Sequence, residues 1–212
     1  MRCQLPREKV EDLIMHQMPE LLEDPSLQDF TLIFSDDQER FPGNKFLFSL
    51  CSPVLRRMFS GSFREAKSGE AHFKDLSSRD FTTAFWLRFG KEFEIQNIEE
   101  LFRVLRVADR FEMSVVSEKI EDVIFQTLNT ETKLAACVEV LNECQSFPLE
   151  RAGPFARELA LDGFEELHLS GRLSDLSADA LDELLASDDL CVEKEEDVLE
   201  GLKGWLRQCG EG

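Results

Sequence analysis

The sequence predicts an α+β domain, built from a small sheet and a helical cluster, followed by an all-α helical domain. Runs of strand-forming residues bounded by turn residues occur in the first part of the chain, as at residues 29–34. From residue 129 onward, apolar residues recur at the spacing of amphipathic helices. The charge also changes there: residues 1–128 hold 23 acidic and 17 basic side chains (net −6), and residues 129–212 hold 20 and 7 (net −13). We therefore predict domains over residues 1–128 and 129–212.

The first element expected is a helix over residues 7–23, which Pro19 kinks or restarts. A strand over residues 29–34 follows, and the turn residues 35–38 lead into a return strand that starts at residue 39. One side of the first helix is apolar and holds Val10, Leu13, Ile14 and Leu21.

The most informative stretch is residues 52–65, which follows a helix expected to start near Asn44. Ser52 can cap a second helix through its side-chain oxygen, and Pro53 takes the first helical position, where its missing N–H costs nothing. A short loop then carries a hydrophobic-x-Glu triplet, Phe63-Arg64-Glu65, which has the character of a docking element and not of a catalytic one. The core-facing stripe of the second helix is predicted to be Leu55, Met58 and Phe59.

The rest of the first domain is expected to combine two strands and three helices. The helix that starts at Asn97 has a capping-box-like beginning, because Glu100 stands three residues later. The predicted strands cover residues 70–75 and 91–95, and the predicted helices cover 80–89, 97–108 and 114–128. Their apolar sides hold Phe81, Ala84, Phe85 and Phe89, then Leu101, Leu105 and Ala108, then Val115, Ile120, Ile124 and Leu128.

The second domain reads as helix after helix, with no strand pattern. Its helices are predicted around Leu134, Val138 and Leu141, over 154–161, around Phe164 and Leu167, over 178–185 and over 195–206. The stripe of the last helix is Val198, Leu199, Leu202, Trp205 and Leu206.

Composition excludes several classes of function. The net charge of −19 disfavours nucleic acid and anionic membrane as partners, because both would repel the chain. The six cysteines form no CxxC pair and lie far in sequence from the three histidines, so neither a metal site nor a cofactor is predicted. Cys51 and Cys137 fall among apolar residues and are expected to be small core side chains.

An enzyme is not predicted, because the sequence has no Gly-rich phosphate loop and no nucleophile–base signature. Neither a signal peptide nor an apolar run of membrane-spanning length is recognised. We therefore expect a protein of the cytoplasm or the nucleus with reduced thiols.

Three segments, in order, resemble the BTB (POZ) domain. They are Asp29-Phe30-Thr31-Leu32-Ile33, the stretch from Phe41 through Lys45 and Ser52-Pro53 to Met58-Phe59, and Ala108-Asp109-Arg110-Phe111. Residues 129–209 resemble the BACK domain that follows BTB in kelch-like proteins. This second resemblance is carried by Leu128 to Thr132, Phe164-Glu165-Glu166, Leu184 to Val192 and Trp205-Leu206. Family BACK domains usually continue with more helices, so this one is expected to be truncated.

The resemblance implies a homodimeric adaptor of a cullin-3 RING ubiquitin ligase, with protein substrate bound by a domain outside this chain. By family analogy, the N-terminal helix crosses the two-fold axis, and the first BACK helices complete the cullin groove. The implied cullin-binding residues are Met58, Phe59, Phe63, Glu65, Asp109, Arg110 and Phe111. The implied dimer residues are Val10, Leu13, Ile14, Asp29 and Lys45.

For these residues, interpretations in which they have only a structural role stay open. Phe63 could pack under its own domain, and Phe111 is more often a core residue than a contact. Asp29 and Lys45 could be an exposed strand-start acid and a lysine whose stem covers apolar surface. The alternative functions are a transcription-linked dimer that binds a corepressor peptide and a dimerisation scaffold without cullin. The scaffold is favoured by Asn44, by Gly163 and by the lack of tyrosine, where the family usually has His, Asn and Tyr.

Overall fold

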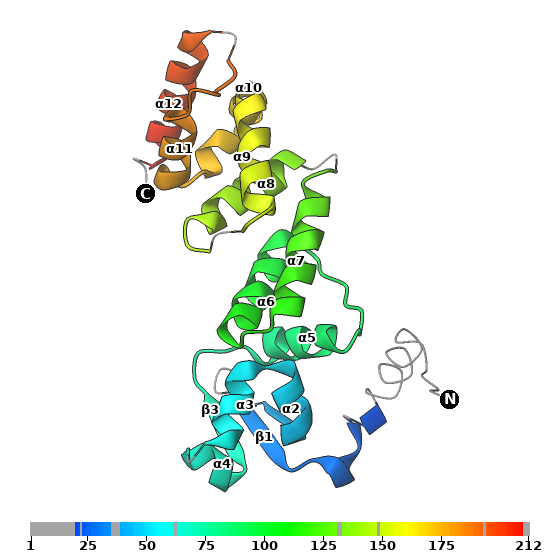
Figure 1. Ribbon diagram of the computed structural model, residues 1–212. Coiled ribbons are helices and arrows are strands. Elements are labelled where there is room, and N and C mark those ends of the chain that lie inside the picture. The colour runs from blue at the N-terminus through cyan, green and yellow to red at the C-terminus, as the bar shows by residue number, and fades with distance from the viewer. Residues whose placement is uncertain are drawn as a thin grey trace, which may run out of the picture. The chain divides into compact units, whose positions relative to one another are not determined.

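The computed structural model describes residues 20, 21, 23–34, 39–61, 63–130, 133–147, 149–192 and 194–209 (Figure 1). Val10, Leu13 and Ile14 of the predicted first helix lie outside these residues. The chain divides into two compact units, Met1–Gln96 with Glu100–Glu118 and Asn97–Glu99 with Lys119–Gly212. The domain boundary at Leu128 stays a prediction.

A three-stranded sheet lies in the first unit and is formed by three of the four predicted strands. It consists of β1 (Phe30–Phe34), β2 (Arg40–Gly43) and β3 (Glu70–Phe73), in the order β2-β1-β3. Leu32 at the centre of β1 pairs with Phe41 of β2 in antiparallel register and with Ala71 of β3 in parallel register. A parallel pair needs a long crossover connection, and the helices between β2 and β3 provide much of it.

Three short helices make up this crossover: α2 (Lys45–Cys51), α3 (Pro53–Ser60) and α4 (Arg64–Ser68). Side chains cap the first two, because Asn44 accepts a hydrogen bond from the Phe46 N–H and Ser52 accepts one from the Leu55 N–H. The predicted loop over the Phe63-Arg64-Glu65 triplet is wrong in part. Phe63 is extended, but α4 starts at the next residue, so Glu65 lies in a helical first turn.

Helix α5 (Ser78–Arg88) and all but the first two residues of α6 (Ile98–Arg110) complete the first unit, together with the beginning of α7 (Ser114–Thr127) and the 3-10 turn η1 (Pro25–Leu27). The strand predicted over residues 91–95 is wrong, because residues 91–96 form no regular element. Instead the chain turns back on α5: the Lys91 N–H donates to the Trp86 carbonyl, and the Lys91 ammonium lies 4.7 Å from the Trp86 ring centroid.

The core of the first unit is a cluster of phenylalanine rings. Phe81 of α5 is at its centre, with ring centroids 5.3 Å from Phe34 and 5.1 Å from Phe111, and further contacts to Phe41 and Phe85. Tilted and edge-to-face arrangements dominate, as the ring quadrupoles favour. The predicted apolar side of α5 is confirmed, since Phe81, Ala84, Phe85 and Phe89 are all buried.

The regular elements described in the second unit are all helices, as predicted. It contains the rest of α7 and then α8 (Lys133–Cys144), α9 (Ala152–Asp162), α10 (Phe164–Leu169), η2 (Arg172–Asp175), α11 (Ala178–Leu185) and α12 (Glu195–Cys209). Buried alanines recur every fourth residue on α9, at Ala152, Ala156 and Ala160, and they let α8 approach closely. The Cys137 thiol of α8 donates to the Ala156 carbonyl at 2.9 Å.

Both cysteines predicted to be core residues are buried. Burial raises the pKa of the Cys51 and Cys137 thiols to about 12, so both are neutral small side chains at physiological pH.

The predicted apolar stripes of α3, α7 and α12 are only partly buried. On α3, Leu55 is buried, whereas Met58 and Phe59 are half-buried. On α7, Val115 is exposed and Val116 takes the core position. On α12, Leu199 and Leu206 are exposed, while Trp205 is held by a hydrogen bond from its Nε1 to the Leu176 carbonyl. Among the helices described, none is both long and apolar enough to cross a membrane.

Candidate functional site

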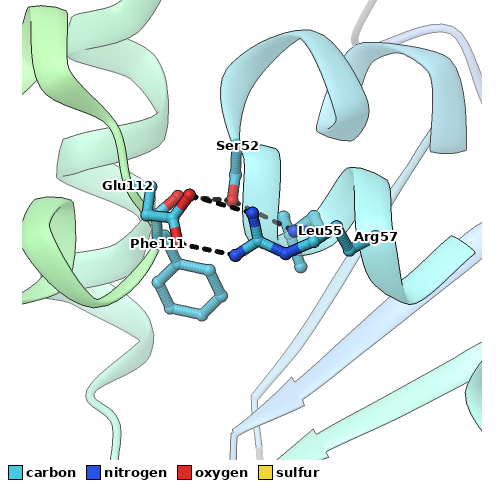
Figure 2. Close-up of polar contacts among 5 residues, drawn as sticks. All are labelled: Ser52, Leu55, Arg57, Phe111 and Glu112. Atoms are coloured by element: carbon cyan, nitrogen blue, oxygen red, sulfur yellow. Dashed lines mark hydrogen bonds and ion pairs between the residues drawn. The ribbon is translucent and has the colours of Figure 1, made fainter.

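The side chain of Ser52 joins the start of α3 to the end of α6. Its Oγ accepts from the Leu55 N–H at 3.1 Å and donates to the Phe111 carbonyl at 2.6 Å (Figure 2). Ser52 is completely buried, so water cannot replace either bond. The serine that sequence analysis assigns to helix capping therefore also fixes α3 against the residues that follow α6.

Ser52→Ala is expected to lower the free energy of unfolding by about 2 kcal/mol. The substitution removes a helix cap and leaves the buried Phe111 carbonyl without its donor. Urea unfolding followed by far-ultraviolet circular dichroism measures the loss. Ser114→Ala, at an exposed serine of α7, is the control and should change stability by less than about 0.5 kcal/mol. Equal stability of the two variants would contradict the double role of Ser52.

A second connection joins the same two segments at the surface. The Arg57 guanidinium makes two hydrogen bonds to the Glu112 carboxylate, Nη1 to Oε2 at 3.0 Å and Nη2 to Oε1 at 2.6 Å (Figure 2). This ion pair holds the pKa of the Glu112 carboxyl below its usual value. Glu112 has a φ of 52°, a left-handed conformation uncommon outside glycine, and it turns the chain between α6 and α7. The two connections together set the position of α3 relative to this turn.

Phe63 projects from the end of this assembly into solvent. Its side chain is 58% exposed, so the structure places it outside the domain's own core. The ring lies over Gly61, where a Cβ atom would come within 2.6 Å of the Phe63 Cδ2. Glycine at this position therefore leaves room for the ring beside α3. Glu65 is half-buried in the first turn of α4.

The other predicted cullin-binding residues divide by burial. Asp109 and Arg110 are exposed at the end of α6, where the Arg110 Nη2 lies 3.1 Å from Asp75 Oδ1. Met58 and Phe59 of α3 are half-buried, and the Phe59 ring packs 4.6 Å from Phe30. We refer to the exposed and half-buried members as the docking surface: Met58, Phe59, Phe63, Glu65, Asp109 and Arg110.

Phe111 cannot belong to this surface, which corrects its place among the predicted contacts. Its side chain is 1% exposed and packs against Phe73 and Phe81. A fully packed ring cannot contact a partner without opening the core. The function of Phe111 in the structure is to fill the core and to offer its carbonyl to Ser52.

The structure brings Asp29 and Lys45 together, but not through their charged ends. Asp29 Oδ1 accepts from the Lys45 backbone N–H at 2.8 Å, at the start of α2. The Lys45 ammonium instead donates to the Ala66 carbonyl at 3.2 Å and lies 5.4 Å from the Phe30 ring centroid. Asp29 thus helps to begin α2, and Lys45 connects α2 with α4.

An apolar surface on α2 was not predicted from the sequence. Phe46 is 68% exposed and Leu50 is 42% exposed, and their spacing of four residues places them on one face of the helix. Five of the seven residues in the α2 sequence KFLFSLC are apolar, which is more than one buried face can hold. That excess is a signal from which an exposed apolar face could have been predicted. Among the described residues, no group of three or more His, Cys, Asp or Glu side chains is placed to hold a metal ion.

The fold and this surface define a protein-interaction module: an α+β domain that presents an exposed aromatic side chain, followed by a helical domain. Comparison with known families agrees. Residues 18–128 match the BTB/POZ domain family, and residues 137–211 match the BACK family, described as BTB And C-terminal Kelch. The chain belongs to the BTB/POZ family and has the BTB–BACK arrangement of kelch-like proteins.

Curated proteins that are similar to this chain carry kelch-like or BTB-domain names. Kelch-like protein 40 of Xenopus laevis is 27% identical over 210 residues, covering 95% of this chain and 33% of the relative. Human Kelch repeat and BTB domain-containing protein 2 is 24% identical over 198 residues, covering 91% and 30%. The chain therefore spans about a third of the length of the curated relatives it matches. Kelch-like BTB–BACK proteins form a family of non-catalytic protein-interaction adaptors.

Two solved BTB-domain structures are similar to part of this chain. The BTB domain of zebrafish PATZ1 has a TM-score of 0.46 at 18% identity, covering 59% of this chain and 99% of that one. The BTB domain of human gigaxonin has a TM-score of 0.46 at 13% identity, covering 58% and 97%.

Proposed function

We propose that this protein is a homodimeric substrate adaptor that binds cullin-3 through the docking surface and delivers protein substrate to a RING ubiquitin ligase. The exposed Phe63, followed two residues later by Glu65, is the observation that carries the proposal. The context adds support, because the pair follows the doubly fixed helix α3 and precedes a BACK domain.

The chemistry of the docking surface suits a helical protein partner. A Phe63 ring that is already exposed can be buried on binding without unfolding any part of the domain. Glu65 can accept hydrogen bonds, and Asp109 and Arg110 supply charged groups of both signs at the rim. The adaptor requires no catalytic group of its own. Substrate would be bound by a further domain of the kind after which the relatives are named, and the place of action would be the cytoplasm or the nucleus.

Isothermal titration with an N-terminal fragment of cullin-3 tests the proposal. The expected result is saturable binding of one fragment per chain, with a Kd of roughly 1 μM or tighter, the range of many specific complexes. A parallel gel-filtration run should show the two proteins eluting together. If the titration shows no heat of binding and the two proteins do not elute together at tens of micromolar, the proposed function is contradicted.

The homodimer has its own support in the apolar face of α2. Phe46 and Leu50 belong to the helix that starts at Lys45, whose backbone N–H donates to Asp29, so two of the five predicted dimer residues lie at the start of the helix with the exposed apolar face. A two-fold dimer would bury this face against its own copy. The same observation favours the second candidate function, a dimerisation scaffold without cullin, because it does not depend on Phe63.

Phe46→Asp is expected to convert the dimer into a monomer. A carboxylate on each subunit would be desolvated and brought near its own copy across the two-fold axis. Light scattering coupled to gel filtration should give about twice the chain mass of 24.4 kDa for the native protein and 24.4 kDa for the variant. Leu169→Asp, at a more exposed leucine of α10, is the matched control and should leave the dimer intact. A native protein that is monomeric at micromolar concentration would contradict the dimer.

A further inference from the structure

Ser60 is the last residue of α3 and stands beside two arginines that precede it by one helical turn. The sequence here is Arg56-Arg57-Met58-Phe59-Ser60, with the arginines at the fourth and third positions before the serine. All three polar side chains are exposed, and the Ser60 hydroxyl makes a long hydrogen bond of 3.4 Å to the Arg57 carbonyl. The hydroxyl is therefore accessible and only weakly held.

The local sequence around Ser60 has a charge of opposite sign to that of the whole chain. Residues 41–64 hold no acidic side chain, although the protein has a net charge of −19. The basic residues in this range are Lys45, Arg56, Arg57 and Arg64. An enzyme that recognises arginine beside a serine would find few comparable segments on so acidic a protein.

The two arginines differ in their bonding. Arg57 is engaged by Glu112 through two hydrogen bonds, whereas no acidic side chain in the described part of the chain pairs with Arg56. Residues three and four apart share a helix face, so a phosphate on Ser60 would lie within reach of both guanidinium groups. Charge-assisted bonds from arginine to phosphate are strong, and Glu112 would have to compete with the phosphate for Arg57.

We propose that Ser60 is a phosphorylation site for an arginine-directed serine kinase. We further propose that the phosphate replaces the Glu112 carboxylate as the hydrogen-bond partner of Arg57. In the reaction, Ser60 Oγ forms a bond to the γ-phosphorus of ATP, the bond from that phosphorus to the β,γ-bridging oxygen breaks, and ADP leaves. The hydroxyl proton passes to the base of the kinase. The product carries about −1.5 to −2 charges at neutral pH.

The modification would act on the docking surface in two ways. It removes the surface connection between α3 and the turn after α6, and it puts a hydrated dianion three residues before Phe63. A phosphate at the C-terminal end of a helix also opposes the helix dipole, which loosens the last turn of α3. This effect on cullin-3 rests on the proposed function, whereas the phosphorylation itself does not.

The first experiment incubates the folded full chain with Mg·ATP and calmodulin-dependent protein kinase, and locates phosphate by mass spectrometry. Incorporation on Ser60 approaching one phosphate per chain is expected, with at least tenfold slower labelling in Arg57→Gln and no label at this site in Ser60→Ala. Glu112→Gln should speed labelling several-fold, because it frees Arg57 for the kinase.

Ser68 is the matched internal control, since it is exposed but has Glu65 at the third position before it. A peptide of residues 53–64 serves as positive control for the kinase. Labelling of the peptide without labelling of Ser60 in the folded chain, or equal labelling of Ser68 and Ser60, would overturn the site. An unchanged rate of Ser60 labelling in Glu112→Gln would overturn the proposal that Arg57 changes its partner from Glu112 to the phosphate.

The second experiment titrates the cullin-3 fragment into phosphorylated and unmodified protein. At least tenfold weaker binding after phosphorylation is expected, and Ser60→Ala treated with kinase should bind like the unmodified chain. Equal affinity of the two forms would overturn regulation of the docking surface. Failure of the unmodified protein to bind would count against the proposed function alone, because phosphate incorporation at Ser60 is measured without cullin.

Discussion

Replacing Phe63 with alanine is expected to weaken binding of the cullin-3 fragment by roughly 100-fold, about 3 kcal/mol. Large aromatic side chains at the centre of an interface dominate its free energy, and truncating one costs 2 kcal/mol or more. The free protein should be almost unaffected, because a side chain that is 58% exposed contributes little to the core. Isothermal titration gives the affinity, and urea unfolding verifies that stability is unchanged.

Two further variants distinguish specific binding at the docking surface from nonspecific hydrophobic binding. Glu65→Gln keeps the shape of the side chain and removes its charge, and it is expected to weaken binding by about tenfold through loss of charge-assisted hydrogen bonds. Leu169→Ala removes the most exposed large apolar side chain described in the protein and should leave the affinity unchanged. Native affinity in a Phe63→Ala/Glu65→Ala double variant would show that cullin-3 is not bound here.

Phe81→Ala is expected to lower the free energy of unfolding by about 4 kcal/mol, the typical cost of deleting a fully buried phenylalanine ring. The ring contacts rings from β1, β2, α5 and the segment after α6, so collapse around the cavity would require several elements to move. Because domains are stable by only about 5–15 kcal/mol, the first unit would lose a large share of its stability. Denaturant unfolding followed by circular dichroism measures the change.

Phe81→Leu keeps most of the apolar volume and should cost about half as much. Val115→Ala, at an exposed position of the same unit, should cost less than about 0.5 kcal/mol. A loss below about 1 kcal/mol in Phe81→Ala would mean that the ring cluster is not the main core of this unit.

Local signals explain why most of the first unit could be predicted from its sequence. The cap at Ser52, the proline after it and the spacing of Phe81 and Phe85 all act within a few residues, and the structure shows each as expected. Helix α4 was missed because it lacks such a start: Phe63 precedes it without a side-chain cap bond. Its sequence REAKS consists mostly of good helix formers, and Gly69 ends it in a left-handed conformation, so helix propensity and this terminal glycine were the available signals.

The strand wrongly predicted over residues 91–95 shows what periodicity cannot tell. The alternation is real, because Phe93 and Ile95 are half-buried while their neighbours are exposed. A strand also requires a neighbouring strand to bond with, and alternation alone does not provide one. Here the Lys91 N–H is taken by the Trp86 carbonyl of α5.

The candidate site depends on contacts between residues far apart in the sequence, and for this reason only its local parts were predicted. The Phe63-Arg64-Glu65 triplet is visible in the sequence, whereas the bonds from Ser52 to Phe111 and from Arg57 to Glu112 join residues more than fifty positions apart. The same limit placed Phe111 among the contacts, since a motif identifies the residue but not its burial.

The two tryptophans, Trp86 on α5 and Trp205 on α12, allow the unfolding of each compact unit to be followed separately by fluorescence. The chain has no tyrosine, so its intrinsic fluorescence under ultraviolet excitation comes almost entirely from these two indole rings. One of them lies in each unit. Trp86 is buried beneath the Lys91 ammonium, and Trp205 is half-buried, so their emission maxima should differ. Trp86→Phe and Trp205→Phe would then each report the melting of one unit alone. Whether the BTB and BACK parts unfold as a single cooperative block could be read from two fluorescence curves.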